Sequence, residues 1–216
     1  MELVFIHGWG FDAGIWRGLC NHLMPHRCHL VDLGFFGNPT LNIKSLSATS
    51  SILIGHSLGF AHGLSKNKNW AGWISINSFP RFVNQGDKSG CSSEIELRGM
   101  RKRLQSDAAS TLHDFYKFIG TSWPITNLDV IKLSEGIDEL RVCDVSDTLS
   151  AFKGPGLVLA SKNDPLVPAA LSEELGNMRR TQLIWHSDGG HVLPLSYPEW
   201  CATKMINYLD EHFTSP

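Results

Sequence analysis

The apolar residues of the chain gather in short runs that end at glycine or at polar residues. Short runs with such boundaries are typical of buried strands, because a helix needs a longer segment. Six of them predict strands, which lie at 3–6, after Cys28, at 52–54, at 73–76, and within GPGLVLAS (154–161) and TQLIWH (181–186).

Other segments repeat apolar residues every three or four positions, which is the spacing of one helix face. We predict helices within 15–23, at 60–64 and at 198–213, the last with Trp200, Met205 and Leu209 turned inward. Strands that alternate with helices along a chain favour a parallel sheet with helices on both faces.

The alternation of strands and helices stops from about residue 80 to residue 153, where polar loops and helical patterns replace strands. It resumes at 154. The chain is therefore predicted to form a core from residues 1–79 and 154–216, with a helical cap, 80–153, inserted between two halves of one sheet.

Composition narrows the classes of protein and partner. The 216 residues are 42% hydrophobic and 19% charged, which is ordinary for one large globular domain. A net charge of −2 gives no reason to expect nucleic acid or an anionic membrane as a partner. The chain has neither an apolar run of the ~20 residues that a membrane span needs nor a secretory signal at its N-terminus.

The cysteines suggest a reducing compartment. There are five, an odd number, and none forms a C-x-x-C pair. Zinc and disulfide frameworks are both poorly supported by this pattern, so we expect free thiols, a cytoplasmic protein and no metal.

A serine between two glycines directly follows one of the predicted strands. Gly55-His56-Ser57-Leu58-Gly59 fits the G-x-S-x-G pattern, in which the chain turns sharply from a strand into a helix. The turn strains the serine and exposes its hydroxyl, as a nucleophile requires. A Gly/Ser turn without chemistry fits the pentapeptide too, so the rest of the chain has to decide.

A serine nucleophile needs a base and a carboxylate that orients the base. In a strand-turn-helix architecture these follow the serine in the order carboxylate, histidine, each after a later strand. Asp164 follows the run LVLAS, and His191 follows LIWHSDGG. Three independent placements agree, which predicts a triad of Ser57, Asp164 and His191.

Other residues compete for two of these roles. His7 and His186 also lie near strand ends, but Gly189-Gly190 before His191 allows close backbone approach. Asp188 is the rival of Asp164 and is expected to form a turn. Asp32 precedes the serine and is expected to be a loop or cap residue.

The oxyanion of acyl transfer needs two N–H donors, each worth about 3 kcal/mol. One is expected from the backbone of Leu58, directly after the nucleophile. The other is expected from the loop His7-Gly8-Trp9-Gly10, where the backbone N–H of Trp9 is the better placed. The Trp9 side chain can pack in the core while its N–H serves in this role.

Together, the HGWG loop, the GHSLG turn, DPLVP and GGH resemble an α/β-hydrolase over essentially the whole chain. HGWGFDAGIW, DPLVP and LRGMRKRLQSDAASTLHDFYKFIG are similar, more narrowly, to the pimeloyl-[acyl-carrier protein] methyl ester esterases of biotin synthesis. His56 departs from that family, where a tryptophan often precedes the serine. The chain begins at what would be the third strand of the full fold, so we expect about six strands.

The cap is predicted to open with a helix at Ser93, whose capping box ends at Glu96, and to bury Leu97, Met100 and Leu104. The resemblance implies that the next helix contacts the acyl chain through Phe115, Tyr116, Lys117, Phe118 and Ile119, although core packing explains these residues nearly as well. The resemblance also implies that Arg98, Arg101 and Arg103 dock an acidic acyl carrier protein. A solvated face is the alternative for these arginines.

The sequence therefore predicts a monomeric serine carboxylesterase that needs no cofactor. Its substrate is predicted to be an acyl ester contacted by Trp9, Ser57, Leu58, His191 and the cap, and specifically the methyl ester of pimeloyl-acyl carrier protein. A general short-acyl esterase or thioesterase and a carbon–carbon bond hydrolase remain alternatives. A catalytically silent ligand-binding module is the alternative outside the enzymes.

Overall fold

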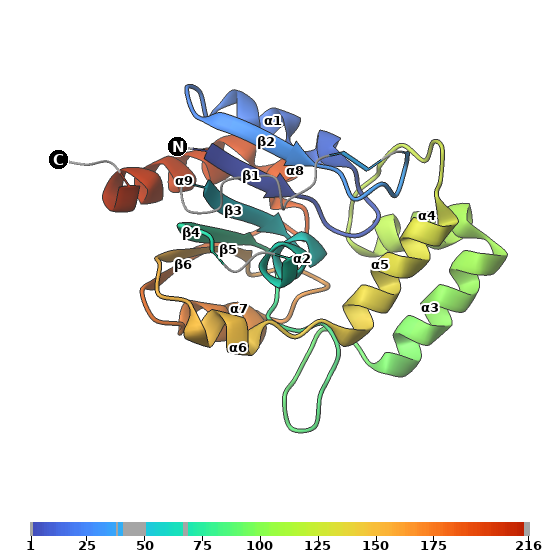
Figure 1. The fold of residues 1–216 in the computed structure, drawn as a ribbon. Helices are drawn as coiled ribbons and strands as arrows, with labels where there is room; N and C mark the ends of the chain where they lie inside the picture. Colours follow the sequence, from blue (N-terminus) through green and yellow to red (C-terminus); the bar gives the residue numbers. More distant parts are fainter. Residues whose placement is uncertain (1, 38, 41–50, 67–68, 214–216) are drawn as a thin grey trace.

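A computed structural model describes residues 2–37, 39–40, 51–66 and 69–213. Within them, six parallel strands form one sheet in the order β2-β1-β3-β4-β5-β6 (Figure 1). The strands are β1 (Glu2–Ile6), β2 (Arg27–Val31), β3 (Ser51–His56), β4 (Gly72–Ile76), β5 (Gly156–Ser161) and β6 (Thr181–His186). The predicted sheet of six strands is confirmed, and each strand covers one predicted run.

Burial explains why the strands were visible as apolar runs rather than as alternating patterns. Every residue of β3, β4 and β5 is buried, as are four of the five in β1. The edge strands β2 and β6 are mostly half-exposed. Strands covered on both faces need apolar residues at every position, so they lose the period of two that marks a half-exposed strand.

Helices cover both faces of the sheet, as predicted (Figure 1). On one face lie α1 (Arg17–Asn21), preceded by η1 (Ala13–Trp16), together with α8 (Leu193–Ser196) and α9 (Pro198–Phe213). On the other face lie α2 (Leu58–Lys66), α6 (Ser146–Ala151) and α7 (Ala169–Gly176). The observed bounds of α9 are those expected, while α2 is longer than the predicted segment 60–64.

Two hydrophobic clusters form the core, one on each face. Successive residues of β1 point to opposite clusters: Phe5 packs with Met205 of α9, and Val4 packs with Phe60 of α2. Leu149 of α6 belongs to the same cluster as Val4. The last helix of the 80–153 segment therefore packs against the sheet rather than over its end.

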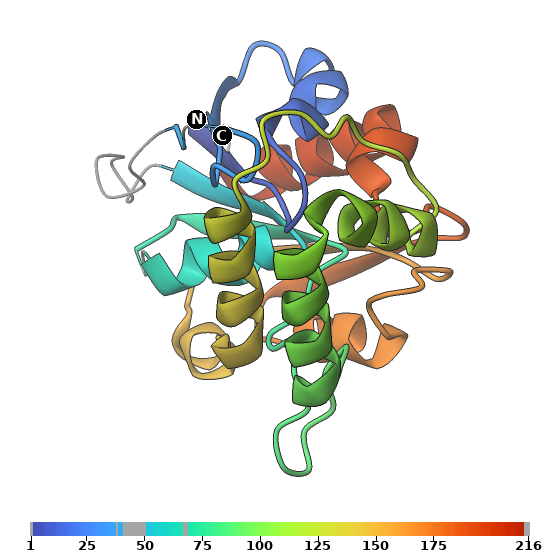
Figure 2. The same cartoon turned by 90° about the vertical axis from the view of Figure 1, so that its right-hand side faces the viewer.

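The other helices of that segment lie at the carboxyl ends of the strands. They are α3 (Glu94–Ser106), α4 (Ala108–Phe118) and α5 (Val130–Val142). Figure 2 shows α3 and α5 side by side, and α3 also packs against α4. Side chains cap all three: Ser93 and Glu96 form the predicted capping box, and Asp107 and Asp129 accept hydrogen bonds at the starts of α4 and α5.

Candidate active site

The turn between β3 and α2 holds Ser57 in an unusual backbone conformation. Its φ is +52°, in the left-handed region that residues other than glycine rarely adopt. Hydrogen bonds fix the turn on both sides, since the Ser57 N–H donates to the Ile76 carbonyl at 3.2 Å and the Ser78 hydroxyl donates to the Ser57 carbonyl at 2.6 Å. The surrounding sheet thus sustains the strain that presents the serine.

Both glycines of the pentapeptide are required by close backbone contacts. A Cβ on Gly55 would overlap the backbone of Phe60, and a Cβ on Gly59 would overlap the carbonyl oxygen of Ile6. Helix α2 can therefore start directly against β3 and β1 only because these positions carry no side chain. This contact places Ser57 at the carboxyl end of the sheet.

The three residues predicted to act together lie in one hydrogen-bonded chain. His191 Nε2 lies 3.2 Å from Ser57 Oγ, and His191 Nδ1 lies 2.9 Å from Asp164 Oδ2. Because a carboxylate only accepts, the proton is on Nδ1, which leaves Nε2 free to accept from the serine hydroxyl. The His191 and Asp164 side chains are 1% and 2% exposed, so water competes little for these bonds.

The loop around Asp164 fixes its carboxylate from the other side. Oδ1 accepts hydrogen bonds from the N–H groups of Leu166 at 2.8 Å and Val167 at 3.0 Å. Oδ2 is left facing His191. The DPLV stretch thus orients the carboxylate through its own backbone.

Asn77 joins the chain before Asp164 to the chain before His191, a role that the sequence analysis missed. Its Oδ1 accepts from the Ser161 N–H at 2.9 Å, and its Nδ2 donates to the Gly190 carbonyl at 2.7 Å. The side chain is buried, and φ is +44°. The only signal in the sequence is an asparagine directly after a buried strand.

The competing residues have other partners. The His7 ring accepts the N–H of Leu33 at Nε2 and donates from Nδ1 to the Gly8 carbonyl, both at 2.9 Å. The His186 ring stacks on Tyr197 at a centroid distance of 4.0 Å, and Asp188 is exposed and accepts from the Tyr197 hydroxyl. None of them is bonded to Ser57 within the described residues.

The last competitor, Asp32, holds a turn. Its carboxylate accepts hydrogen bonds from the N–H groups of Ala13 at 3.0 Å and Gly34 at 2.8 Å. This agrees with the expected role of a loop or cap residue.

The two expected oxyanion donors are both available. Leu58 is the first residue of α2, where a helix leaves its N–H groups without internal acceptors. Trp9 follows β1 and is 4% exposed. Among the hydrogen bonds of the described residues, neither backbone N–H has an acceptor.

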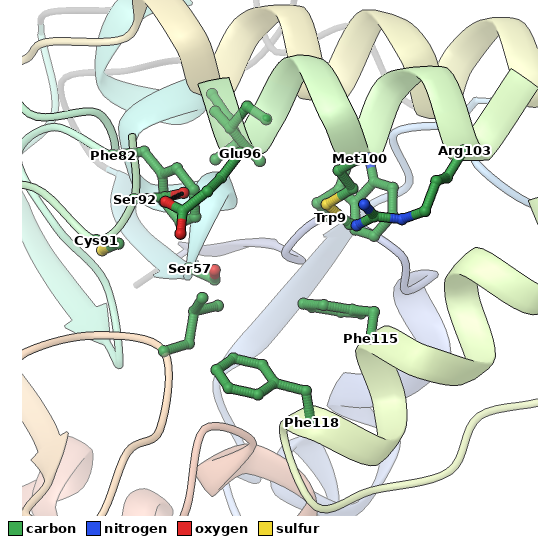
Figure 3. Close-up of a pocket in the computed structure, with 13 residues that line it drawn as sticks. Trp9, Ser57, Phe82, Cys91, Ser92, Glu96, Met100, Arg103, Phe115 and Phe118 are labelled. Carbon is green, nitrogen blue, oxygen red and sulfur yellow. Dashed lines mark hydrogen bonds between the residues drawn. The ribbon is translucent and has the colours of Figure 1, made fainter. Parts of the chain in front are cut away.

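A cavity of about 330 Å³ opens above Ser57, between the core and α3, α4 and α5 (Figure 3). Its lining is mostly apolar and comes from Trp9, Ser57, Phe82, Cys91, Ser92, Glu96, Leu97, Met100, Arg103, Phe115, Phe118, Leu140 and Leu166. Hydrogen bonds from Ser93 lower the pKa of Glu96, so this rim carboxylate stays ionised at neutral pH. The cavity fits an apolar group bound next to the serine hydroxyl.

Only two of the five α4-region residues expected to contact substrate reach this cavity. Phe115 and Phe118 line it, three positions apart on one helix face (Figure 3). Tyr116 and Ile119 are buried away from it, and Lys117 is exposed. Tyr116, Lys117 and Ile119 are not among the lining residues, because consecutive helix residues point about 100° apart; their contact with substrate stays a prediction.

The cap arginines do not form one surface. Arg98 pairs with Glu94 at 2.6 Å, and Arg101 pairs with Asp138 at 3.1 Å, both at the surface. Arg103 lies on a different face of α3, at the rim of the cavity. Two of the three cations are therefore already paired with carboxylates.

Two features bear on cofactors and membranes. Across the described residues, no three His, Cys, Asp or Glu side chains come together in a way that could hold a metal ion. Nor does any described helix combine the length and the apolar character that crossing a membrane requires. All five cysteines are free thiols.

The fold is shared with several solved structures. An esterase from Exiguobacterium antarcticum matches with a TM-score of 0.84 over 97% of this chain and 92% of that one, at 19% identity. A hydrolase from Oleispira antarctica matches with a TM-score of 0.80 over 98% and 91%, at 16% identity. The chain has the α/β-hydrolase fold.

Similarity in sequence extends over nearly the full chain. A pimeloyl-[acyl-carrier protein] methyl ester esterase from Yersinia enterocolitica is 27% identical over 99% of this chain and 95% of its own length. One of the same name from Wigglesworthia glossinidia brevipalpis is 29% identical over 99% and 95%. No family model matches the chain. The predicted resemblance and the predicted enzyme class, carboxylic ester hydrolase, are confirmed by these relatives.

Proposed function

We propose that the chain is a serine carboxylesterase in which Ser57, His191 and Asp164 form the catalytic triad. The observation that carries the proposal is the hydrogen-bonded chain from Asp164 through His191 to Ser57, at the floor of an apolar cavity. The 2.9 Å bond to Asp164 selects the imidazole tautomer that can take the serine proton.

The reaction follows from this geometry. Ser57 Oγ attacks the ester carbonyl while its proton passes to His191 Nε2, and Asp164 stabilises the imidazolium. The backbone N–H groups of Trp9 and Leu58 stabilise the oxyanion. His191 then protonates the departing alcohol, and water, activated by the same imidazole, hydrolyses the acyl-enzyme.

The proposed substrate is the methyl ester of pimeloyl-acyl carrier protein. Support comes from the names of the curated relatives and from the cavity, whose aromatic and aliphatic lining suits an acyl chain. The division into a core (1–79 and 154–216) and a cap (80–153) belongs to this proposal, since Phe115 and Phe118 would bring the cap to the acyl chain. We also propose a cytoplasmic monomer.

Labelling and substitution of Ser57 test whether the protein is a serine esterase. A fluorophosphonate should label the wild-type protein at Ser57 and nowhere else, and Ser57→Ala should lower kcat for p-nitrophenyl butyrate by on the order of 10⁶ while the protein stays folded. A variant that kept a tenth of the activity would remove Ser57 from its role, and a wild type with no p-nitrophenol release would favour a silent binding module.

The substrate itself is tested by comparing kcat/KM for methyl pimeloyl-acyl carrier protein with kcat/KM for simple esters and thioesters. A clear preference for the carrier-bound ester supports the proposal. Equal values would make the protein a general short-acyl esterase. Cleavage of a carbon–carbon bond in a diketone, in preference to hydrolysis of any ester, would indicate a carbon–carbon bond hydrolase.

A further inference from the structure

The loop that follows β1 is held by two cap helices through buried side-chain hydrogen bonds. The Tyr116 hydroxyl, from α4, donates to the carbonyl oxygen of Gly10. The Trp9 indole Nε1 donates to the carbonyl oxygen of Leu133, in α5, at 2.8 Å. These bonds join segments that are 106 and 124 residues apart in sequence, so they are features of the folded cap and core together.

The same loop is packed so closely that small residues are required at the contacts. A Cβ on Gly136 of α5 would lie 2.7 Å from Trp9 Cδ1, and a Cβ on Gly10 would lie 3.2 Å from Leu112 Cδ2 in α4. The Trp9 ring meets Phe115 edge-on, with the ring centroids 5.1 Å apart. Helices α4 and α5 therefore enclose the loop from two sides.

The Trp9 backbone N–H belongs to the Gly8–Trp9 peptide, whose carbonyl oxygen accepts a hydrogen bond from His7 Nδ1 at 2.9 Å, and the rest of the loop has to keep that peptide in place. Gly8 and Gly10 flank Trp9, and glycine leaves φ and ψ widely free. Gly10 adopts a φ of +74°, which only glycine reaches without strain. The two long-range bonds bind the loop at the Trp9 ring and at the Gly10 carbonyl, so they hold the chain on the carboxyl side of the Gly8–Trp9 peptide that carries the N–H.

We propose that Tyr116 is a positioning residue of the oxyanion hole: its hydroxyl fixes the Gly10 carbonyl and thereby aims the backbone N–H of Trp9. The proposal rests on the proposed function, since it assigns that N–H to the oxyanion. Misplacing a preorganised donor weakens transition-state binding more than substrate binding. The cap then contributes to the chemical step as well as to the acyl cavity.

Tyr116→Phe tests this role, and Tyr208→Phe is a matched control. Tyr208 is also buried, and its hydroxyl donates to the Pro155 carbonyl at 2.8 Å, far from the loop. Each variant removes a buried phenol hydroxyl that donates to a backbone carbonyl oxygen and keeps the ring; the Tyr208 hydroxyl also lies 3.4 Å from the Trp73 carbonyl. The measurements are kcat and KM for p-nitrophenyl butyrate, thermal unfolding, and the inhibition constant of an alkyl trifluoromethyl ketone, which adds the serine and forms an oxyanion.

Tyr116→Phe should lower kcat about tenfold, with KM nearly unchanged. It should raise the inhibition constant of the ketone by a similar factor. Tyr208→Phe should lower the unfolding temperature comparably but leave kcat and ketone inhibition at the wild-type values. Wild-type kcat and ketone inhibition in Tyr116→Phe would overturn the proposal, as would equal losses in both variants. Either result leaves the triad untouched, because fluorophosphonate labelling at Ser57 tests it separately.

Discussion

The ring of His56 donates a hydrogen bond from Nε2 to the backbone carbonyl oxygen of His191, at 2.9 Å. The residue before Ser57 thus holds the backbone of the proposed base. Because a carbonyl only accepts, His56 carries its proton on Nε2, and its Nδ1 is buried without a partner among the described residues. Burial, with a smaller contribution from nearby His191, lowers the pKa of His56 to about 3, so this ring is neutral at pH 7.

His56 should make the fold sensitive to acid. In the unfolded chain its pKa returns to about 6.5. Below that pH His56 is protonated in the unfolded state but stays neutral in the folded state. The free energy of unfolding should therefore fall from about pH 6.5 down to about pH 3, by about 1.4 kcal/mol per pH unit for this one group. Urea unfolding at pH 7 and pH 5 measures this loss.

His56→Gln is the matched control, since glutamine keeps a side-chain N–H donor but does not titrate. The loss of stability between pH 7 and pH 5 should be smaller in the variant by about 2 kcal/mol. An identical loss in both proteins would mean that other groups cause the acid sensitivity.

The carboxylate of the triad can be separated from its nearest rival by two conservative substitutions. Asp164→Asn keeps the shape of the side chain but favours the wrong tautomer of His191, so kcat should fall by about 10⁴. Asp188→Asn should leave kcat near the wild-type value, because Asp188 is exposed and its partner is Tyr197. The comparison requires both variants at equal concentration with p-nitrophenyl butyrate; the reverse ranking would move the carboxylate to Asp188.

Phe118 should govern acyl-chain preference. It is 56% exposed, yet it lines the cavity, so a bound acyl chain can cover a ring that is otherwise open to water. Phe118→Ala should raise KM for p-nitrophenyl octanoate about tenfold, which corresponds to about 1.4 kcal/mol of lost apolar contact, and should change KM for the acetate much less. Lys117→Ala, one residue away and outside the cavity, should change neither value. A uniform effect on both esters would assign Phe118 to cap stability.

Much of the site was predictable because a parallel sheet brings the carboxyl ends of its strands together. Ser57, Asp164 and His191 each follow a separate apolar run; the strand order places the last two runs, β5 and β6, next to each other and separates them from β3 by β4 alone. The central strands were clear for a different reason, since they are buried on both faces and form nearly continuous apolar runs.

What the sequence could not reveal depends on contacts between distant segments. Asn77 and Tyr116 form hydrogen bonds to the carbonyl groups of Gly190 and Gly10, and the sequence near each residue does not predict so distant a partner. The helix period, in contrast, could have separated Phe115 and Phe118 from their neighbours. The resemblance assigned substrate contact to five consecutive residues, and consecutive residues of a helix do not share one face.

The arginines test the carrier-protein proposal. Reversing the charge at Arg98, Arg101 and Arg103 to glutamate should lower kcat/KM for methyl pimeloyl-acyl carrier protein, because long-range attraction speeds association with an acidic partner. Turnover of p-nitrophenyl butyrate should fall much less, by the share that Arg103 contributes at the rim of the cavity. Raising the salt should shrink the difference between wild type and variant, since the Debye length is only ~8 Å at 0.15 M.

A matched control carries the same change in net charge at the amino ends of the strands, away from α3. Arg27, Arg179 and Arg180 lie at the start of β2 and just before β6, and their replacement by glutamate should leave both substrates unaffected. Equal losses of kcat/KM in both triple variants would mean that net charge, and not the position of the arginines, causes the effect. No loss in the cap variant would withdraw the docking role.

The pairing of β4 with β5 also sets when activity can return during refolding. Ser57 lies on the first part of the chain and Asp164 and His191 on the last, and among the described residues the two parts join in the sheet only where Trp73 to Ile76 pair with Gly156 to Leu159. Closing so long a loop is entropically costly and belongs to the slow, non-local part of folding. Helices and the first strands can form earlier without yielding any catalysis. Recovered esterase activity should therefore not precede this strand pairing.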